Sequence, residues 1–140
     1  KLPEELQFIA NARLPQKTTT ARMDGKVCVV TGSTSGVGYQ AIKRLAQGGA
    51  DIVMVCRNEK KAAAVQEQLQ RQYPVNVDVV QADFSRFSDV RWAAETIRNQ
   101  YPKLDVLINN AGVHYTHRTL NQDGIEMVFA VNHLASFLFT

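Results

Sequence analysis

The feature that most constrains the fold is an alternation of two sequence patterns that begins at residue 26. Short apolar runs alternate there, four times, with segments whose apolar residues recur at helical spacing. The apolar runs are KVCVVTG at 26–32, ADIVMVC at 50–56, VNVDVVQAD at 75–83 and LDVLINNAG at 104–112. This order predicts a parallel sheet with helices on both faces, and continuously apolar runs predict strands buried on both sides.

The predicted helices lie after these runs. The first covers about 38–47, and the second begins after Asn58, a favoured N-cap, and ends before Pro74. The third is marked by apolar residues between 90 and 97 and ends before Pro102. The last covers about 125–140 and is apolar nearly all round, which predicts that it is buried.

Residues 1–24 read as an N-terminal extension before the domain at 25–140. Apolar residues at helical spacing within 3–13 predict a short amphipathic helix, which Pro15 ends, and QKTTTAR reads as a linker. No run is apolar for long enough to span a bilayer, so no transmembrane segment is predicted. We expect a cytoplasmic protein, with peripheral membrane association left open.

The 140 residues carry a net charge of +3, and the basic residues are scattered among acidic ones, which argues against a nucleic-acid partner. Cys28 and Cys56 lie inside apolar runs, which predicts buried, reduced thiols. The three histidines have no ligand-like spacing, so we predict no metal site.

A glycine-rich stretch, TGSTSGVG, joins the first apolar run to the first helix. A strand that turns directly into a helix presents free backbone N–H groups, and the helix dipole favours an anion beside them. We predict a cradle for a dinucleotide pyrophosphate, made by Thr31, Gly32, Ser33, Thr34, Ser35, Gly36, Val37 and Gly38. The alternative is a tight turn without a ligand, since the spacing T-G-x-x-x-G-x-G is not the G-x-G-x-x-G fingerprint.

A basic residue follows the second run, at a place where many dinucleotide sites have an acidic residue. Cys56 and Arg57 stand there, about 20 residues beyond the glycines. A guanidinium at this place suits a 2′-phosphate, which predicts that NADP(H) is preferred over NAD(H). The alternative is a solvated arginine in a loop.

Four features together resemble the short-chain dehydrogenase/reductase family over about 25–140. They are TGSTSGVG, the AD that ends the third run with Asp83 and precedes Phe84, NNAG in the fourth run, and an asparagine inside VFAVNHLASFLFT. The stretch RTLNQDGIEMVFAVNHLASFLFT and the CRN after the second run are similar to the retinol dehydrogenase-like branch. The resemblance implies an α/β fold, a Rossmann-type doubly wound parallel sheet, truncated after the helix that follows the fourth strand.

The resemblance also implies roles for single residues. Asp83 would bond the adenine amino group, and Asn132 would be catalytic, helping to hold a water and a lysine in a proton relay. The NNAG residues would bind the cofactor; they are Asn109, Asn110, Ala111 and Gly112. Architectural alternatives stay open: a turn cap for Asp83, backbone-satisfying amides for Asn109 and Asn110, a positive-φ hinge for Gly112, and a buried amide that fixes local structure for Asn132.

The resemblance implies an NADP(H)-dependent oxidoreductase that acts on a small-molecule alcohol/carbonyl pair, with CH–OH donors, and that forms a homo-oligomer when full length. The resemblance places the catalytic serine and a Tyr-x-x-x-Lys beyond the segment that contains Asn132, and no Tyr-x-x-x-Lys follows Asn132 in these 140 residues, so we expect a fragment that is inactive alone. In such a fragment the fourth strand becomes a sheet edge and the last helix exposes apolar residues. The alternative is a non-catalytic dinucleotide-binding module.

Overall fold

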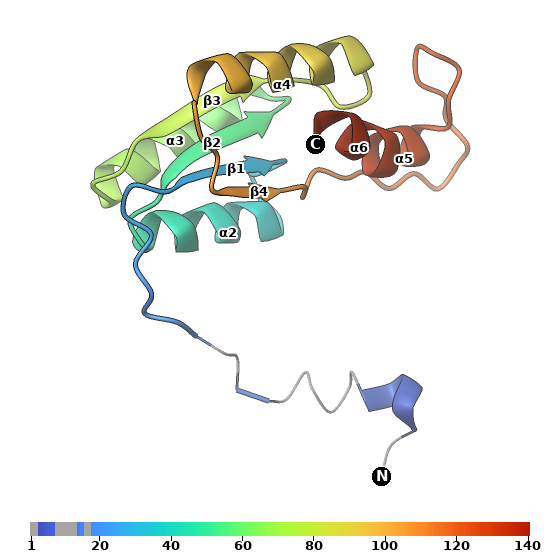
Figure 1. The fold of residues 1–140 in the computed structure, drawn as a ribbon. Helices are drawn as coiled ribbons and strands as arrows, with labels where there is room; N and C mark the ends of the chain where they lie inside the picture. The colour runs from blue at the N-terminus through green and yellow to red at the C-terminus, as the bar shows by residue number, and fades with distance from the viewer. Residues whose placement is uncertain (1–2, 8–13, 16–17) are drawn as a thin grey trace.

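The computed structural model describes residues 3–7, 14–15 and 18–140. Glu4–Leu6 form a short 3₁₀ helix, η1, at the start of the predicted amphipathic helix. Residues 8–13, which make up most of that prediction, lie outside the described residues. Figure 1 shows the ordered elements that follow as one sheet flanked by helices.

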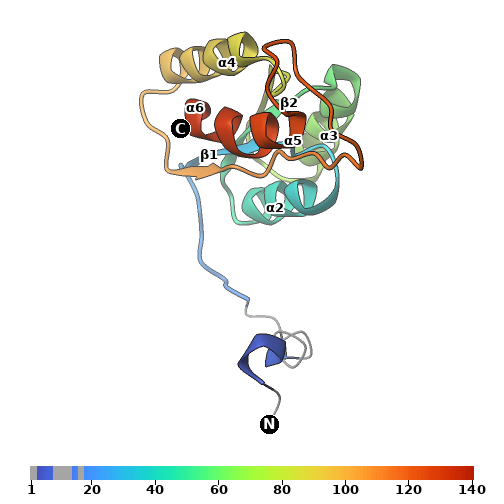
Figure 2. The ribbon, with the colours of Figure 1, turned by 90° about the vertical axis from the view of Figure 1, so that its right-hand side faces the viewer.

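The sheet has four parallel strands in the order β3-β2-β1-β4. They are β1 (Val27–Thr31), β2 (Asp51–Cys56), β3 (Val77–Gln81) and β4 (Val106–Ile108). Helices α2 (Gly36–Gln47) and α3 (Glu59–Gln72) pack on one face, and α4 (Phe87–Gln100) packs on the other. Figures 1 and 2 show α2 and α4 on opposite sides of the strands. The predicted Rossmann-type α/β fold is confirmed.

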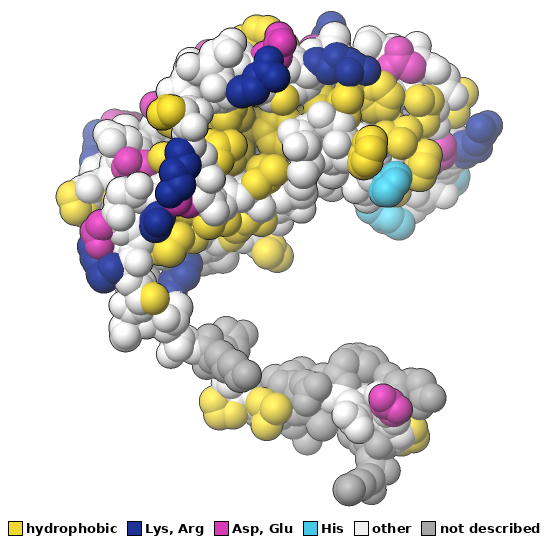
Figure 3. Space-filling view, viewed as in Figure 1, with side chains coloured by type: hydrophobic (Ala, Val, Ile, Leu, Met, Phe, Trp, Pro, Cys, Tyr) yellow, Lys and Arg dark blue, Asp and Glu magenta, His cyan; other side chains and the backbone are white. Residues whose placement is uncertain are grey.

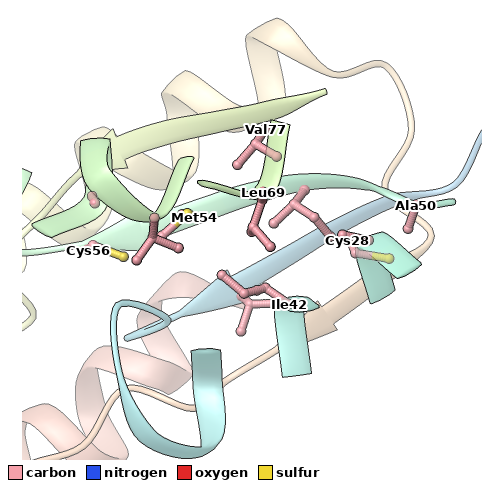
Figure 4. Packing of buried hydrophobic residues seen from close by; sticks show 12 residues of the cluster. Cys28, Ile42, Ala50, Met54, Cys56, Leu69 and Val77 are labelled. Carbon is pink, nitrogen blue, oxygen red and sulfur yellow. The ribbon is translucent and has the colours of Figure 1, made fainter. Parts of the chain in front are cut away.

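Alternate residues of the two central strands supply the cores on the two faces, because successive strand side chains point to opposite sides. Cys28 and Met54 pack against Ile42 of α2 and Leu69 of α3, as Figure 4 shows. Val29 and Val53 pack on the opposite face with α4 and the last helix. Both cysteines are buried and free, as predicted, and burial raises the pKa of each thiol.

The prediction of strands buried on both sides holds for β1 and β2 and is wrong for β3 and β4. In β3, Asp78 and Gln81 are exposed, and all three residues of β4 are only partly buried. The reason is their place in the strand order, since β3 and β4 form the two edges of the sheet. The predicted runs at 75–83 and 104–112 were also too long by several residues.

The helices follow the predictions with shifted ends. Helix α2 begins two residues early, at Gly36, and α3 begins after Asn58, whose Oδ1 accepts a hydrogen bond from the Lys61 N–H at 2.9 Å. The predicted helix at 125–140 is a continuous helical stretch in three parts. They are α5 (Met127–Phe129), the π-helical η2 (Ala130–Ala135) and α6 (Ser136–Phe139).

One side of the sheet is left open, as predicted. β4 pairs only with β1 among the described residues, and a hollow of about 430 Å³ lies between α4, β4 and α6. Leu107 and Leu138 line it, and Figure 3 shows hydrophobic side chains gathered on this face. The last helix is less buried than predicted, because the outer side chains Phe129 and Phe137 are 51% and 78% exposed.

No helix in the part of the chain that the structure describes is both long and apolar enough to cross a membrane.

Candidate functional site

A groove of about 460 Å³ opens where the carboxyl ends of the parallel strands meet. Open α/β sheets bind ligands at this edge, because the loops that leave the strands converge there. Each strand contributes a loop to the lining. The predicted site residues that line the groove are Gly32, Thr34, Ser35, Arg57, Asp83, Phe84, Asn110, Ala111 and Gly112.

The start of α2 offers backbone donors beside this groove. Ser35 is the N-cap, but its side chain makes no capping hydrogen bond, and no acidic residue stands in the first turn. Gly36 has φ +57°, and a Cβ built on it would meet nothing within 4 Å. Free N–H groups, a helix dipole and open space at the glycine together suit a phosphate group.

The NNAG stretch supports the glycine-rich turn through hydrogen bonds. The Thr31 hydroxyl oxygen accepts from the N–H groups of Asn110 and Ala111 at 3.0 and 2.9 Å. The Asn110 side-chain amide donates to the carbonyls of Thr31 and Gly32, both at 3.0 Å. Asn110 therefore satisfies loop backbone, which is the architectural alternative, and it lines the groove as well. Thr31 is completely buried.

Other residues of the glycine motif also lie away from the groove lining. Ser33 is completely buried, and its hydroxyl donates to the Val30 carbonyl at 3.2 Å. Val37 is 79% exposed on the first turn of α2. A Cβ on Gly38 would lie 2.4 Å from the Asn110 Nδ2, so glycine is needed there for close packing against NNAG. Most of the motif thus either lines the groove or holds its walls together, whereas Val37 does neither.

Two basic side chains line the groove beyond β2. Arg57 follows β2 directly, and Lys61 stands in the first turn of α3. Among the described residues that line the groove, Asp83 is the only acidic one, and it follows β3 rather than β2. Sequence reasoning missed Lys61, although its place four residues after Arg57, just inside a capped helix, was a signal for it.

Asp83 caps the turn after β3, as the alternative prediction for this residue stated. Its Oδ1 accepts from the Ser85 N–H at 2.9 Å and from the Ser85 hydroxyl at 2.8 Å. Its own N–H donates to Asp89 at 3.3 Å. The neighbouring Phe84 is 6% exposed, and its ring packs on Phe139 with centroids 5.4 Å apart.

Asn132 is exposed, so the prediction that it is buried is wrong. The helix exposes one side, and Asn132 lies in the π-helical part of it. Both polar atoms of its amide are nevertheless hydrogen-bonded, because Oδ1 accepts from the Val113 N–H at 2.8 Å and Nδ2 donates to the Val113 carbonyl at 3.0 Å. Single π turns are frequent at functional sites. The exposed Asn109 lies outside the groove lining and donates to the Thr140 hydroxyl at 3.0 Å.

Comparison with known proteins decides the family. The model of the short chain dehydrogenase family matches residues 26–140. The chain belongs to the short chain dehydrogenase family. The predicted resemblance to this family is confirmed.

Single relatives agree with this assignment. Retinol dehydrogenase 11 from Homo sapiens is 39% identical over 124 residues, which cover 88% of this chain and 39% of that protein. The structure of a short-chain dehydrogenase from Sphingobium yanoikuyae in complex with NADPH has a TM-score of 0.71 and 29% identity, covering 81% of this chain and 45% of that one. L-Sorbose reductase from Gluconobacter frateurii, complexed with NADPH and L-sorbose, has a TM-score of 0.74 and 27% identity, covering 86% of this chain and 47% of that one.

The chain therefore spans about two fifths of the length of the curated relatives it matches.

Proposed function

We propose that this chain supplies the NADP(H) site of an oxidoreductase that acts on a small-molecule alcohol/carbonyl pair. The observation that carries the proposal is the basic end of the groove, where Arg57 and Lys61 lie without an acidic neighbour in the lining beyond β2. An acid there would bond a ribose 2′-hydroxyl and repel a 2′-phosphate, whereas two cations attract the phosphate. The Sphingobium and Gluconobacter relatives, both complexed with NADPH, support the same choice.

The residues present fit a dinucleotide along the whole groove. We assign the pyrophosphate to the free N–H groups at the start of α2, beside Gly36. We assign the 2′-phosphate to Arg57 and Lys61, and the adenine amino group to Asp83. When bound, the nicotinamide supplies hydride transfer to or from a carbon atom. This chain's residues hold the cofactor and orient it against the sheet edge.

Asn132 is proposed to serve the proton relay as a positioning residue. Both polar atoms of its amide are engaged with Val113, one residue beyond NNAG. These two bonds hold the loop after β4 against the π-helical turn and fix the backbone on both sides. We propose that the relay depends on this fixed backbone. The activity itself is proposed for the protein as a whole, and turnover of an alcohol or carbonyl by the full gene product separates it from a non-catalytic binding module.

The test of the cofactor assignment is a charge change at each basic residue. Arg57→Asp removes the cation and places an acid beside the 2′-phosphate, and Lys61→Ala removes the second cation. A hydrogen bond to a charged group is worth about 1.5–3 kcal/mol, so each change should weaken NADPH binding roughly 10- to 100-fold. NADH has no 2′-phosphate, so its affinity should stay within about twofold for Lys61→Ala and should not fall for Arg57→Asp.

The matched control is Lys60→Ala, which removes an exposed neighbouring lysine that does not line the groove. Calorimetric titration of each variant with NADPH and NADH gives the dissociation constants. An unchanged NADPH affinity in Arg57→Asp, or an equal loss in Lys60→Ala, would show that the basic end does not read the 2′-phosphate.

A further inference from the structure

A buried polar residue lies in the loop between β4 and α5, outside the residues assigned so far. Asn121 is 8% exposed. Its Oδ1 accepts from the N–H groups of Asp123 and Ile125 at 3.0 and 2.9 Å. We call residues 119–127 the clasp, because backbone bonds from Asn121 to Ile125 and from Met127 to Thr119, both 2.8 Å, close it on itself.

Asn121 also joins the clasp to a distant loop. Its Nδ2 donates to the Ser85 carbonyl at 3.2 Å, across a separation of 36 residues. Ser85 in turn donates from its N–H and from its hydroxyl to the Asp83 Oδ1. The clasp is therefore linked to the acid that lines the groove by hydrogen bonds to two sides of Ser85, which the backbone of that residue joins.

The same clasp is fixed at its other end to the last helix. Glu126 is the N-cap of α5, and its carboxylate accepts from the N–H groups of Val128 and Phe129 at 3.0 and 2.8 Å. These bonds lower the pKa of Glu126. The clasp is thus fixed to the start of α5. This limits the movement of Asn121 relative to the turn at Ser85.

We propose that Asn121 is a positioning residue for the adenine end of the groove. The hydrogen bond from Asn121 to the Ser85 carbonyl orients Ser85. The Ser85 N–H and hydroxyl then donate to one oxygen of the Asp83 carboxylate, Oδ1. The other oxygen, Oδ2, has no hydrogen-bond partner among the described residues and takes the adenine amino group. This inference rests on the proposed function, in which Asp83 reads that amino group.

The test compares NADPH with its hypoxanthine analogue, in which a carbonyl oxygen replaces the adenine amino group. Wild-type protein should prefer NADPH by about tenfold, the value of one hydrogen bond to a charged acceptor. Asn121→Asp keeps oxygen acceptors for Asp123 and Ile125 but cannot donate to Ser85. We expect this variant to lose at least about threefold of the preference, while its preference for NADPH over NADH stays as in the wild type.

Two further variants keep the inference testable if Asn121→Asp unfolds. Ser85→Ala removes the hydroxyl link to Asp83 and should also lower the preference. Gln122→Ala shortens an exposed side chain of the clasp and leaves Asn121 and Ser85 unchanged, so it should keep the preference. Dissociation constants from calorimetry and melting temperatures are measured for all variants.

The outcomes separate the two levels of the proposal. Wild-type protein that binds both dinucleotides equally would overturn the assignment of Asp83. If Asn121→Asp or Ser85→Ala kept the full wild-type preference for NADPH over the hypoxanthine analogue, only the positioning role of Asn121 would be overturned. An equal loss in Gln122→Ala would also overturn it, because the loss would then not depend on the hydrogen bond from Asn121 to Ser85.

Discussion

Replacing Thr31 by valine tests whether the glycine motif is held together from inside the protein. Thr31 is completely buried at the end of β1. Its hydroxyl oxygen accepts two backbone N–H groups of the NNAG stretch, about 80 residues along the chain. Valine keeps the shape and the β-branched character but cannot accept a hydrogen bond.

The magnitude follows from the two donors that lose their acceptor. Each buried N–H group left unsatisfied costs about 1–3 kcal/mol. Asn110 and Ala111 are partly buried, so water reaches part of this turn and the lower end of the range applies to each. We expect the free energy of unfolding to fall by about 2 kcal/mol, which lowers a urea midpoint by about 1 M for a typical m-value of about 2 kcal/mol/M.

The assay is urea unfolding followed by circular dichroism, with Thr31→Ser as the matched control. Serine keeps the oxygen and loses only a methyl group, so it should cost clearly less than valine. NADPH binding should weaken in Thr31→Val although Thr31 does not line the groove. A valine variant as stable as the wild type, or a serine variant equally destabilised, would refute the reasoning that these two hydrogen bonds hold the motif to NNAG.

Two further changes test the packing and the charge of the sheet. Gly38→Ala should destabilise the protein in urea, because its Cβ would lie 2.6 Å from the Gly32 carbonyl oxygen, whereas an ordinary helix glycine gains about 0.5–1 kcal/mol from alanine; a gain would contradict the packing. Lys103 and the Val27 N–H lower the pKa of Asp105 to about 2. The unfolded value is about 3.9, so this stabilisation is complete above about pH 4 and is lost towards pH 2. Asp105→Asn should flatten unfolding free energy against pH in that window, and an unchanged slope would contradict the assignment.

The alternation of apolar and amphipathic segments was sufficient to predict the fold class, because β1 and β2 bury every residue from Cys28 to Thr31 and from Ile52 to Cys56. The Asn58 cap was also predictable, since its hydrogen bond to Lys61 joins residues three apart. Exposure was predicted less well. The last helix contains the apolar residues of a buried element, yet Phe137 and Asn132 face outwards.

The groove shows the same division between local and distant causes. The order of residues was enough to predict that a glycine-rich turn leads from a strand into a helix, that a basic residue follows the second strand, and that an acidic residue follows the third. These features depend on residues near one another in the chain, whose backbone preferences are local. Whether each side chain faces the groove depended on partners far away in sequence.

Those partners are set by the packing of the whole fold. It turned Thr31 and Ser33 inwards, brought Lys61 to the groove beside Arg57, and joined Asn121 to Ser85. A buried polar atom must find a hydrogen-bond partner, and folding brings many candidates within reach of it. The choice among them is made by the packing of the strands and loops, which no local pattern of residues specifies.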